Sequence, residues 1–172
     1  MKMAPLPDDG LICRVAVLPF ANEASYSQAD NIFGRVFVSE LINTGFLLSQ
    51  EGDVRKILKQ MMVIPGLMPS VEQLRAIADR LGVQVIVIGS VVEMRDKDRY
   101  GQKLDPSAAV ILRIIEADSG RTLWTTYARR EGKEYRKVMH FGLINSVTAL
   151  SEKMAAEIIE TWFEGGVKKC AE

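Results

Sequence analysis

The most constraining feature of this chain is a nearly unbroken apolar run at residues 84–94. Residues 85–88 read Val-Ile-Val-Ile, four β-branched side chains in succession. Because neighbouring side chains of a strand point to opposite faces, this run predicts a strand that is apolar on both faces. We therefore expect a central strand with helices packed on both sides of its sheet, as in α/β proteins.

Periodicity and turn signals predict the other elements. A second apolar run at residues 12–20 favours another buried strand, and apolar residues recur at helical spacing in four later segments. Ser70 followed by Gln73 is a capping-box signature, and Ser27 with Asp30 resembles one. The other expected elements are helices at 28–44, 54–62, 71–81 and 138–163 and strands at 46–49, 108–116 and 122–130.

These elements give the order β-α-β-α-α-β-β-β-α and the fold class α/β (α+β), with helices packed on a mixed β-sheet of about five strands. Early alternation of strands and helices favours parallel neighbours, whereas Gly120 in a short connection predicts an antiparallel hairpin. Residues 95–106 are polar and charged, so we expect an exposed loop there. We expect residues 1–10 to be a linker, 11–165 a single domain and 166–172 a tail.

The charge balance argues against a general attraction to polyanions. The 172 residues include 22 basic and 22 acidic side chains, so the formal net charge is +0. Such a chain has no overall pull towards nucleic acid or anionic lipid. No stretch of about 18 uncharged apolar residues occurs, and the first ten residues are too short and too polar for an export signal. A cleaved signal upstream of residue 1 stays compatible with the sequence.

The sequence offers no recognisable catalytic, cofactor or metal site. It contains neither a dinucleotide-binding nor a P-loop glycine motif, and no G-x-S-x-G elbow. His140 is the single histidine, and we expect it to pack or hydrogen-bond rather than act as a base. We expect Cys13 to be a buried core residue and Cys170 a free exposed thiol, since their spacing is not that of metal ligands. A disulfide between them is an alternative that the sequence leaves open.

Two segments are candidates for contact with a partner protein. Residues 61–69 form an apolar connection with three methionines, of which Met62 and Met68 flank Leu67. Exposed apolar, methionine-rich surfaces suit adaptable binding, but the same segment could instead fold back over the core. Residues 129–137 are basic with one aromatic side chain, and are either a site for an acidic partner or a solvated connection. The candidate residues there are Arg129, Arg130 and Tyr135.

Four stretches carry a resemblance to a known family. They are V-A-V-L-P-F-A-N at 15–22, G-F at 45–46, L-G-V-Q-V-I-V-I-G-S-V at 81–91 and I-L-R-I-I-E-A-D-S-G-R-T-L-W at 111–124. The chain resembles the bacterial envelope lipoproteins that include the curli-secretion lipoprotein CsgG and the penicillin-binding-protein activator LpoB. The resemblance covers roughly residues 15–163, and its motifs are core and turn signatures that specify fold better than activity.

The resemblance implies an α/β sandwich that is exported, anchored by an upstream lipid and bound to other envelope components. It carries over no catalytic residues. Pore-forming members have additional long hairpins, and the connections here are too short for them, so we do not expect a secretion channel. Ile12 before Cys13 is not the small residue that lipid attachment needs, so no lipid-bearing cysteine is identified in this chain.

Together these features predict a non-enzymatic cell-envelope (lipo)protein domain on the periplasmic side of the outer membrane. We expect it to bind protein partners during assembly of a surface structure or the cell wall. A homo-oligomer is compatible with the sequence, and we expect no nucleic-acid partner. The alternatives are a small-molecule-binding sensory module and a small enzyme that uses His140.

Overall fold

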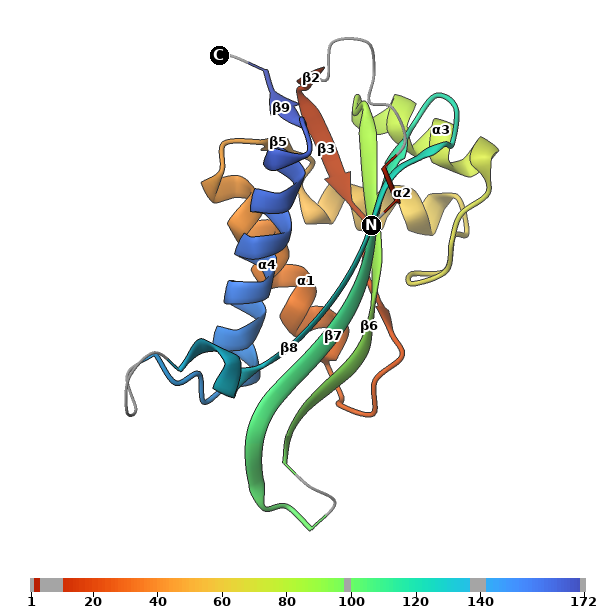
Figure 1. The fold of residues 1–172 in the computed structure, drawn as a ribbon. Helices are drawn as coiled ribbons and strands as arrows, with labels where there is room; N and C mark the ends of the chain where they lie inside the picture. The colour runs from red at the N-terminus through yellow and green to blue at the C-terminus, as the bar shows by residue number, and fades with distance from the viewer. Residues whose placement is uncertain (1, 4–10, 98–99, 137–141, 171–172) are drawn as a thin grey trace.

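The protein folds around one mixed sheet with a pair of helices on each face (Figure 1). The computed structural model describes residues 2–3, 11–97, 100–136 and 142–170. Its elements are β1 (Lys2–Met3), β2 (Leu11–Ile12), β3 (Arg14–Val17), β4 (Ala21–Asn22), α1 (Ala29–Asn43), β5 (Leu47–Leu48), α2 (Glu51–Gln60), α3 (Val71–Leu81), β6 (Val85–Lys97), β7 (Lys103–Glu116), β8 (Thr122–Glu131), the 3-10 helix η1 (Gly132–Tyr135), α4 (Val147–Glu164) and β9 (Lys168–Lys169).

The strand order of the main sheet is β1-β8-β7-β6-β3-β5, and β4 also pairs with β6. The early strands β3 and β5 are parallel neighbours, whereas β6, β7 and β8 form an antiparallel meander. The predicted α/β class with a mixed sheet is therefore confirmed, and β6 is central as its apolar run requires. Gly120 takes positive φ (69°) in the β7–β8 connection, as predicted.

One of the two predicted helix caps is present in the structure. Ser70 accepts a hydrogen bond from the Gln73 amide and the Gln73 side chain accepts one from Ser70, so the predicted capping box starts α3. The predicted cap of α1 by Ser27 and Asp30 is wrong. Gln28 is the residue before this helix, in the left-handed conformation and without a side-chain capping bond.

The predicted loop at residues 95–106 is also wrong, because β6 and β7 continue as a long hairpin through most of it. Their register extends to Lys97 opposite Lys103, with two irregularities on the way. Polar composition does not disfavour strands here, because side chains on this part of the sheet pair with one another: Glu93 accepts hydrogen bonds from Arg95 and Ser107. The hairpin reaches past the helices in Figure 1.

The last helix begins later than predicted. α4 starts at Val147, after the Ser146 side chain accepts a hydrogen bond from the Ala149 amide. Apolar spacing alone suggested residue 138, but this N-cap and the positive φ of Gly142 end the helical pattern upstream. His140 lies outside the described residues.

The two faces of the sheet carry different cores. On one face α1 and α4 enclose an aromatic cluster, with ring centroids 5.5–6.1 Å apart. The other face is covered by α2 and α3 over a smaller core without aromatic rings, centred on Leu74, Ile77 and Ile86. The members of the aromatic cluster are Phe20, Phe33, Phe37 and Trp162.

Candidate interaction surface

The helices α2 and α3 cover only part of their face of the sheet. They pack on β3, β6 and the end of β7. Among the described residues no helix covers the same face of β7 and β8 farther along. Two rows of paired residues define this area, which we call the open face: Ile88, Arg113 and Thr125, and beside them Ser90, Ile111 and Tyr127.

The open face is apolar and aromatic around one cation. Tyr127 is 63% exposed, and Arg113 is also exposed while Ile111 is half-buried. Arg113 forms no ion pair within the described part of the chain. Such a mixture of aromatic, aliphatic and arginine side chains is typical of the energetically important centres of protein interfaces.

The apolar connection at residues 61–69, here called the apolar loop, lies beside the open face. Val63 and Pro69 are buried, and Val63 belongs to the α2–α3 core. The side chains between these anchors point outwards, and Leu67 and Met68 are 62% and 51% exposed. Some residues of this segment therefore cover the core, while Met62, Leu67 and Met68 face solvent. Contact of these three residues with a partner stays a prediction.

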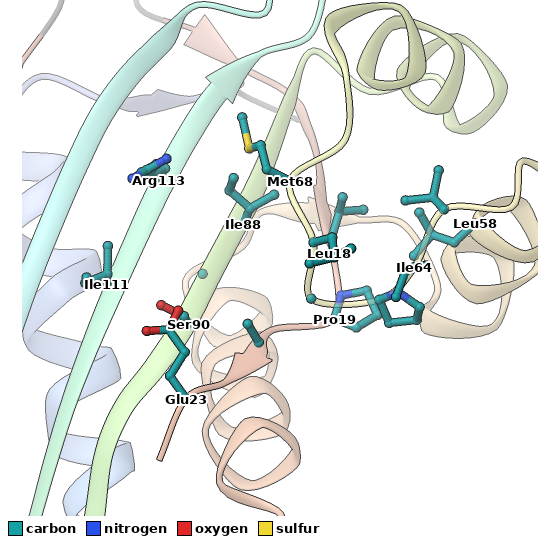
Figure 2. A pocket seen from close by; sticks show the side chains of 16 residues that line it. Leu18, Pro19, Glu23, Leu58, Ile64, Met68, Ile88, Ser90, Ile111 and Arg113 are labelled. Carbon is teal, nitrogen blue, oxygen red and sulfur yellow. The ribbon is translucent and has the colours of Figure 1, made fainter.

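A hollow of about 220 Å³ separates the apolar loop from the open face. Figure 2 shows its walls, with Leu18, Ile64 and Met68 on one side and residues of β6 and β7 on the other. Glu23 and Arg113 supply its charges. Its volume lies below the about 300–1,000 Å³ of typical small-molecule sites, so it suits one or two apolar side chains of a protein better.

A charged cluster borders the open face towards the hairpin. Glu93 accepts hydrogen bonds from Arg95 (2.6 Å) and Ser107 (3.3 Å) and lies 3.5 Å from the Arg129 Nε atom. Burial alone would raise the pKa of Glu93, but the hydrogen bonds and charges of Arg95 and Arg129 hold it below its usual value. Glu131 also pairs with Arg129 at 3.2 Å. The predicted candidate Arg129 is thus bound within the molecule, at the rim of the open face.

The predicted candidates Arg130 and Tyr135 point to the opposite side of the sheet. Glu157 of α4 accepts hydrogen bonds from the Arg130 Nε atom (3.0 Å) and from the Tyr135 hydroxyl (2.7 Å). Burial, together with this bond and the charge of Glu157, raises the pKa of Tyr135 well above its ordinary value. The structure therefore does not gather Arg129, Arg130 and Tyr135 into one basic patch.

A second, larger groove runs between α1 and α2. It encloses about 710 Å³, within the range of small-molecule sites, and its lining includes Val38, Ile42 and Val54 with Arg35 at its polar margin. Residues 64–67 of the apolar loop lie along it as well. No motif in the sequence marks this groove, because it depends on where two helices stand relative to the sheet edge.

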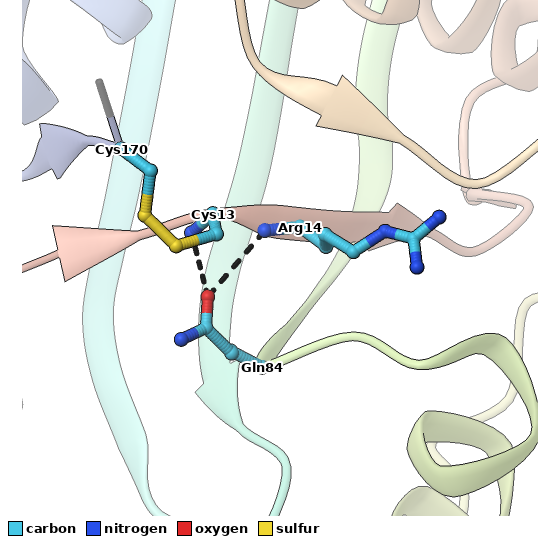
Figure 3. Close-up of a disulfide and its surroundings, with 4 residues drawn as sticks. All are labelled: Cys13, Arg14, Gln84 and Cys170. Atoms are coloured by element: carbon cyan, nitrogen blue, oxygen red, sulfur yellow. Dashed lines mark hydrogen bonds between the residues drawn. A yellow bond between two sulfur atoms is a disulfide. The ribbon is translucent and has the colours of Figure 1, made fainter. Parts of the chain in front are cut away.

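A disulfide joins the two cysteines, which corrects the expectation of a buried core thiol and a free exposed one. The Cys13 and Cys170 Cα atoms are 4.9 Å apart, although 157 residues separate them in sequence. Parallel pairing of β2 with β9 brings them together, and the Gln84 side chain accepts a hydrogen bond from the Cys13 amide at 2.6 Å (Figure 3). Local sequence carries no signal for a contact of this range.

Neither a metal centre nor a membrane span is found in the described ranges. No group of three or more histidine, cysteine or carboxylate side chains stands where it could hold a metal ion there. None of the helices in the described segments has the length and apolar composition to cross a bilayer. The alternative of a small enzyme using His140 stays a prediction, since that residue is not among those described.

Comparison with known proteins finds likeness in structure only. No family model and no curated protein matches the sequence. A PelC dodecamer from Paraburkholderia phytofirmans superposes with a TM-score of 0.59 at 16% identity, covering 92% of this chain and 92% of that one. Lipoprotein GNA1162 from Neisseria meningitidis superposes with a TM-score of 0.57 at 16% identity, covering 88% of this chain and 99% of that one.

The C-terminal domain of LpoB from Salmonella enterica gives a TM-score of 0.52 at 16% identity, covering 69% of this chain and 82% of that one. Identities this low show a common fold and nothing further. The resemblance to CsgG is not among these findings and stays a prediction. The chain thus shares its fold with the LpoB C-terminal domain and with lipoprotein GNA1162.

Proposed function

We propose that this protein is a non-enzymatic domain of the bacterial cell envelope that binds protein partners in the assembly of a surface structure or the cell wall. The observation that carries the proposal is the open face with the apolar loop beside it. Apolar side chains of two separate elements are exposed together there, and contiguous exposed apolar surface usually marks an interaction site. The shared fold with LpoB and lipoprotein GNA1162 supports an envelope role.

The disulfide supports an extracytoplasmic location independently of the structural likeness. Disulfides persist in oxidising compartments such as the periplasm and are rare in the cytosol. The Cys13–Cys170 bond ties the first strands to the C-terminal strand, so it is part of the fold. The disulfide supports the periplasmic part of the proposal; a position at the outer membrane, with an upstream lipid anchor, rests on the resemblance to envelope lipoproteins.

The surface suggests how a partner would bind. Tyr127, Ile111 and Leu67 provide apolar contact area, and the hollow between them can receive a partner side chain. The charged cluster around Glu93 and Arg129 lies at the margin, where it would exclude water from the centre and disfavour wrongly charged partners.

The location is tested by labelling free thiols in intact cells and in fractions separated under conditions that trap thiols. Without a reductant, Cys13 and Cys170 should resist alkylation, and the protein should fractionate with the outer membrane. Rapid alkylation of both cysteines in the cytosolic fraction would overturn the envelope proposal.

Partner binding is tested by a photo-crosslinking residue at Leu67 in the producing cells. The matched control carries the same residue at Lys59, which is exposed on the outer side of α2. We expect one discrete envelope protein to be joined at Leu67 and none at Lys59. Identical products at both positions, or none at either, would contradict binding through this surface.

The groove between α1 and α2 favours a second candidate, a small-molecule-binding sensory module. Its volume and apolar lining suit an elongated, mostly apolar ligand. Native mass spectrometry of protein purified from its own envelope tests this. A bound mass that disappears in a Val38→Trp variant would support the module, and the apo mass alone would reject it.

A further inference from the structure

The outer side of α4 is acidic. Its exposed residues include Glu152, Glu160 and Glu164 against one lysine, Lys153. Ala156 lies between the first two glutamates on the same stripe, since residues four apart on a helix share a face. Glu152 and Glu160 are therefore about 12 Å apart along the helix, with a small side chain between them.

The open face stands on the other side of the same strands. α4 packs on β7 and β8 from one side, and the open face is the uncovered opposite side of these strands (Figure 1). At the rim Arg95 and Arg129 are paired with Glu93 and Glu131, whereas Arg113 on the open face forms no ion pair among the described residues and lines the hollow together with Glu23. The molecule thus presents the Arg113 cation on one side of these strands and the acidic stripe of α4 on the other.

We propose that the open face of one copy of this chain binds the outer side of α4 of a second copy. The inference rests on the proposed function and names a partner for its surface. Arg113 would lie between Glu152 and Glu160 of the next copy, and Tyr127 would pack over Ala156. Charge complementarity and the gap at Ala156 favour this occupant over an unrelated apolar protein.

The contact joins two different surfaces. A bound pair therefore still has one free open face, on one copy, and one free α4 surface, on the other. A heterologous contact of this type repeats until the rotation closes a ring, or else extends as a filament. The PelC protein of the same fold was solved as a dodecamer, so this fold is compatible with closed assemblies.

Pairing of strand edges is a less favourable way to join two copies. On its outer side β8 pairs, within the described part of the chain, only with the two-residue strand β1, at Trp124 and Thr125. Farther along, the outer edge of β8, unpaired among the described residues, carries the charged residues Arg129, Arg130 and Glu131. Charged side chains on an edge strand disfavour the addition of another strand. The charged edge of β8 is therefore a less favourable surface for assembly than the open face.

The test uses two variants that should each fail alone and assemble when mixed. Arg113→Glu places a carboxylate opposite the acidic stripe, and Glu152→Arg/Glu160→Arg places arginines opposite Arg113. In the mixture every contact again pairs opposite charges, because copies of the two variants alternate. Sedimentation velocity of the oxidised domain at low ionic strength measures the mass, and unchanged thermal melting confirms folding.

We expect the parent to associate, each variant alone to associate at least about tenfold more weakly, and the mixture to regain the parental mass. Lys56→Glu, an exposed charge reversal on α2, should associate like the parent. A parent that stays monomeric over the whole concentration range, or a mixture that stays as dissociated as its components, would overturn the inference. Crosslinking of Leu67 to a different envelope protein would in that case still support the proposed function, so the two failures are distinguishable.

Discussion

The two faces of the sheet are covered to different extents, and helix length accounts for the difference. α1 and α4 have 15 and 18 residues, whereas α2 and α3 have 10 and 11. At 1.5 Å per residue the first pair spans about 22–27 Å and the second about 15–17 Å. The 14-residue strand β7 spans about 45 Å. Short helices near one end of such long strands leave the other end of that face bare.

The comparison separates residues that stabilise the fold from residues that are available for binding. On the α1–α4 face aromatic side chains are buried between helices and sheet. On the other face the side chains beyond α2 and α3 contact solvent, with Tyr127 as the largest. Equivalent aromatic truncations on the two faces should therefore have very different effects.

The largest expected effect is that of Trp162→Ala. Trp162 is 3% exposed and its ring packs against Phe37, so its removal should lower the free energy of unfolding by about 3–5 kcal/mol. Tyr127→Ala on the open face is the matched control and should change it by about 0.5 kcal/mol or less. Urea unfolding followed by circular dichroism measures both. Equal losses would contradict the difference between the faces.

Loss of the disulfide should have the second largest effect on stability. In the Cys13→Ser/Cys170→Ser variant the constraint on a very long loop is absent, which should lower the free energy of unfolding by about 2–4 kcal/mol. Chemical denaturation of the variant beside the oxidised parent measures this. The reduced parent should match the variant; if oxidised parent and variant unfold together, the bond contributes nothing to stability.

Two glycine-to-alanine substitutions compare a position with no room for a Cβ atom with a position that has room for one. A Cβ atom at Gly165 would overlap the Trp124 ring, so Gly165→Ala should cost about 1–3 kcal/mol. In α1, a Cβ atom at Gly34 would stand 3.9 Å from Phe20, in ordinary contact, so Gly34→Ala should stabilise by about 0.5–1 kcal/mol. Melting temperatures should move in opposite directions, and a tolerated Gly165→Ala would show that α4 can shift on the sheet.

The smallest effect concerns pH and the rim of the open face. Because Arg95 and Arg129 lower the pKa of Glu93, its contribution to stability is present above its usual pKa of 4.5 and is lost as pH falls through the lowered value. Glu93→Gln should flatten the acid limb of the stability curve in thermal melts below pH 4.5. A variant whose acid limb coincides with the parent's would rule out this contribution.

The sequence predicted the elements whose signals are local. The β-branched run at 85–88 identified the central strand, and Ser70 with Gln73 identified the start of α3. The predictions failed where tertiary pairing decides the structure. The charged residues at the end of β6 continue the strand because their backbone pairs with β7 as far as Lys97 opposite Lys103, and no local propensity encodes this pairing.

The candidate surface was predictable only in part. The exposed apolar residues Met62, Leu67 and Met68 stand out as a methionine-rich connection in the sequence. Ile111, Arg113 and Tyr127 read as ordinary strand residues, since their exposure depends on how far α2 and α3 extend over the sheet. The disulfide likewise depends on β2 meeting β9 at the end of the chain.

The most direct test of the account is covalent footprinting of tyrosine side chains in intact cells and in the purified monomeric domain. Tyr127 on the open face is 63% exposed and Tyr100 on the hairpin is 74% exposed, so both should be labelled in the purified domain. If a partner covers the open face in the envelope, labelling of Tyr127 will fall there while that of Tyr100 persists. Equal labelling of Tyr127 in cells and in the purified domain would contradict the claim that this face is an interaction surface.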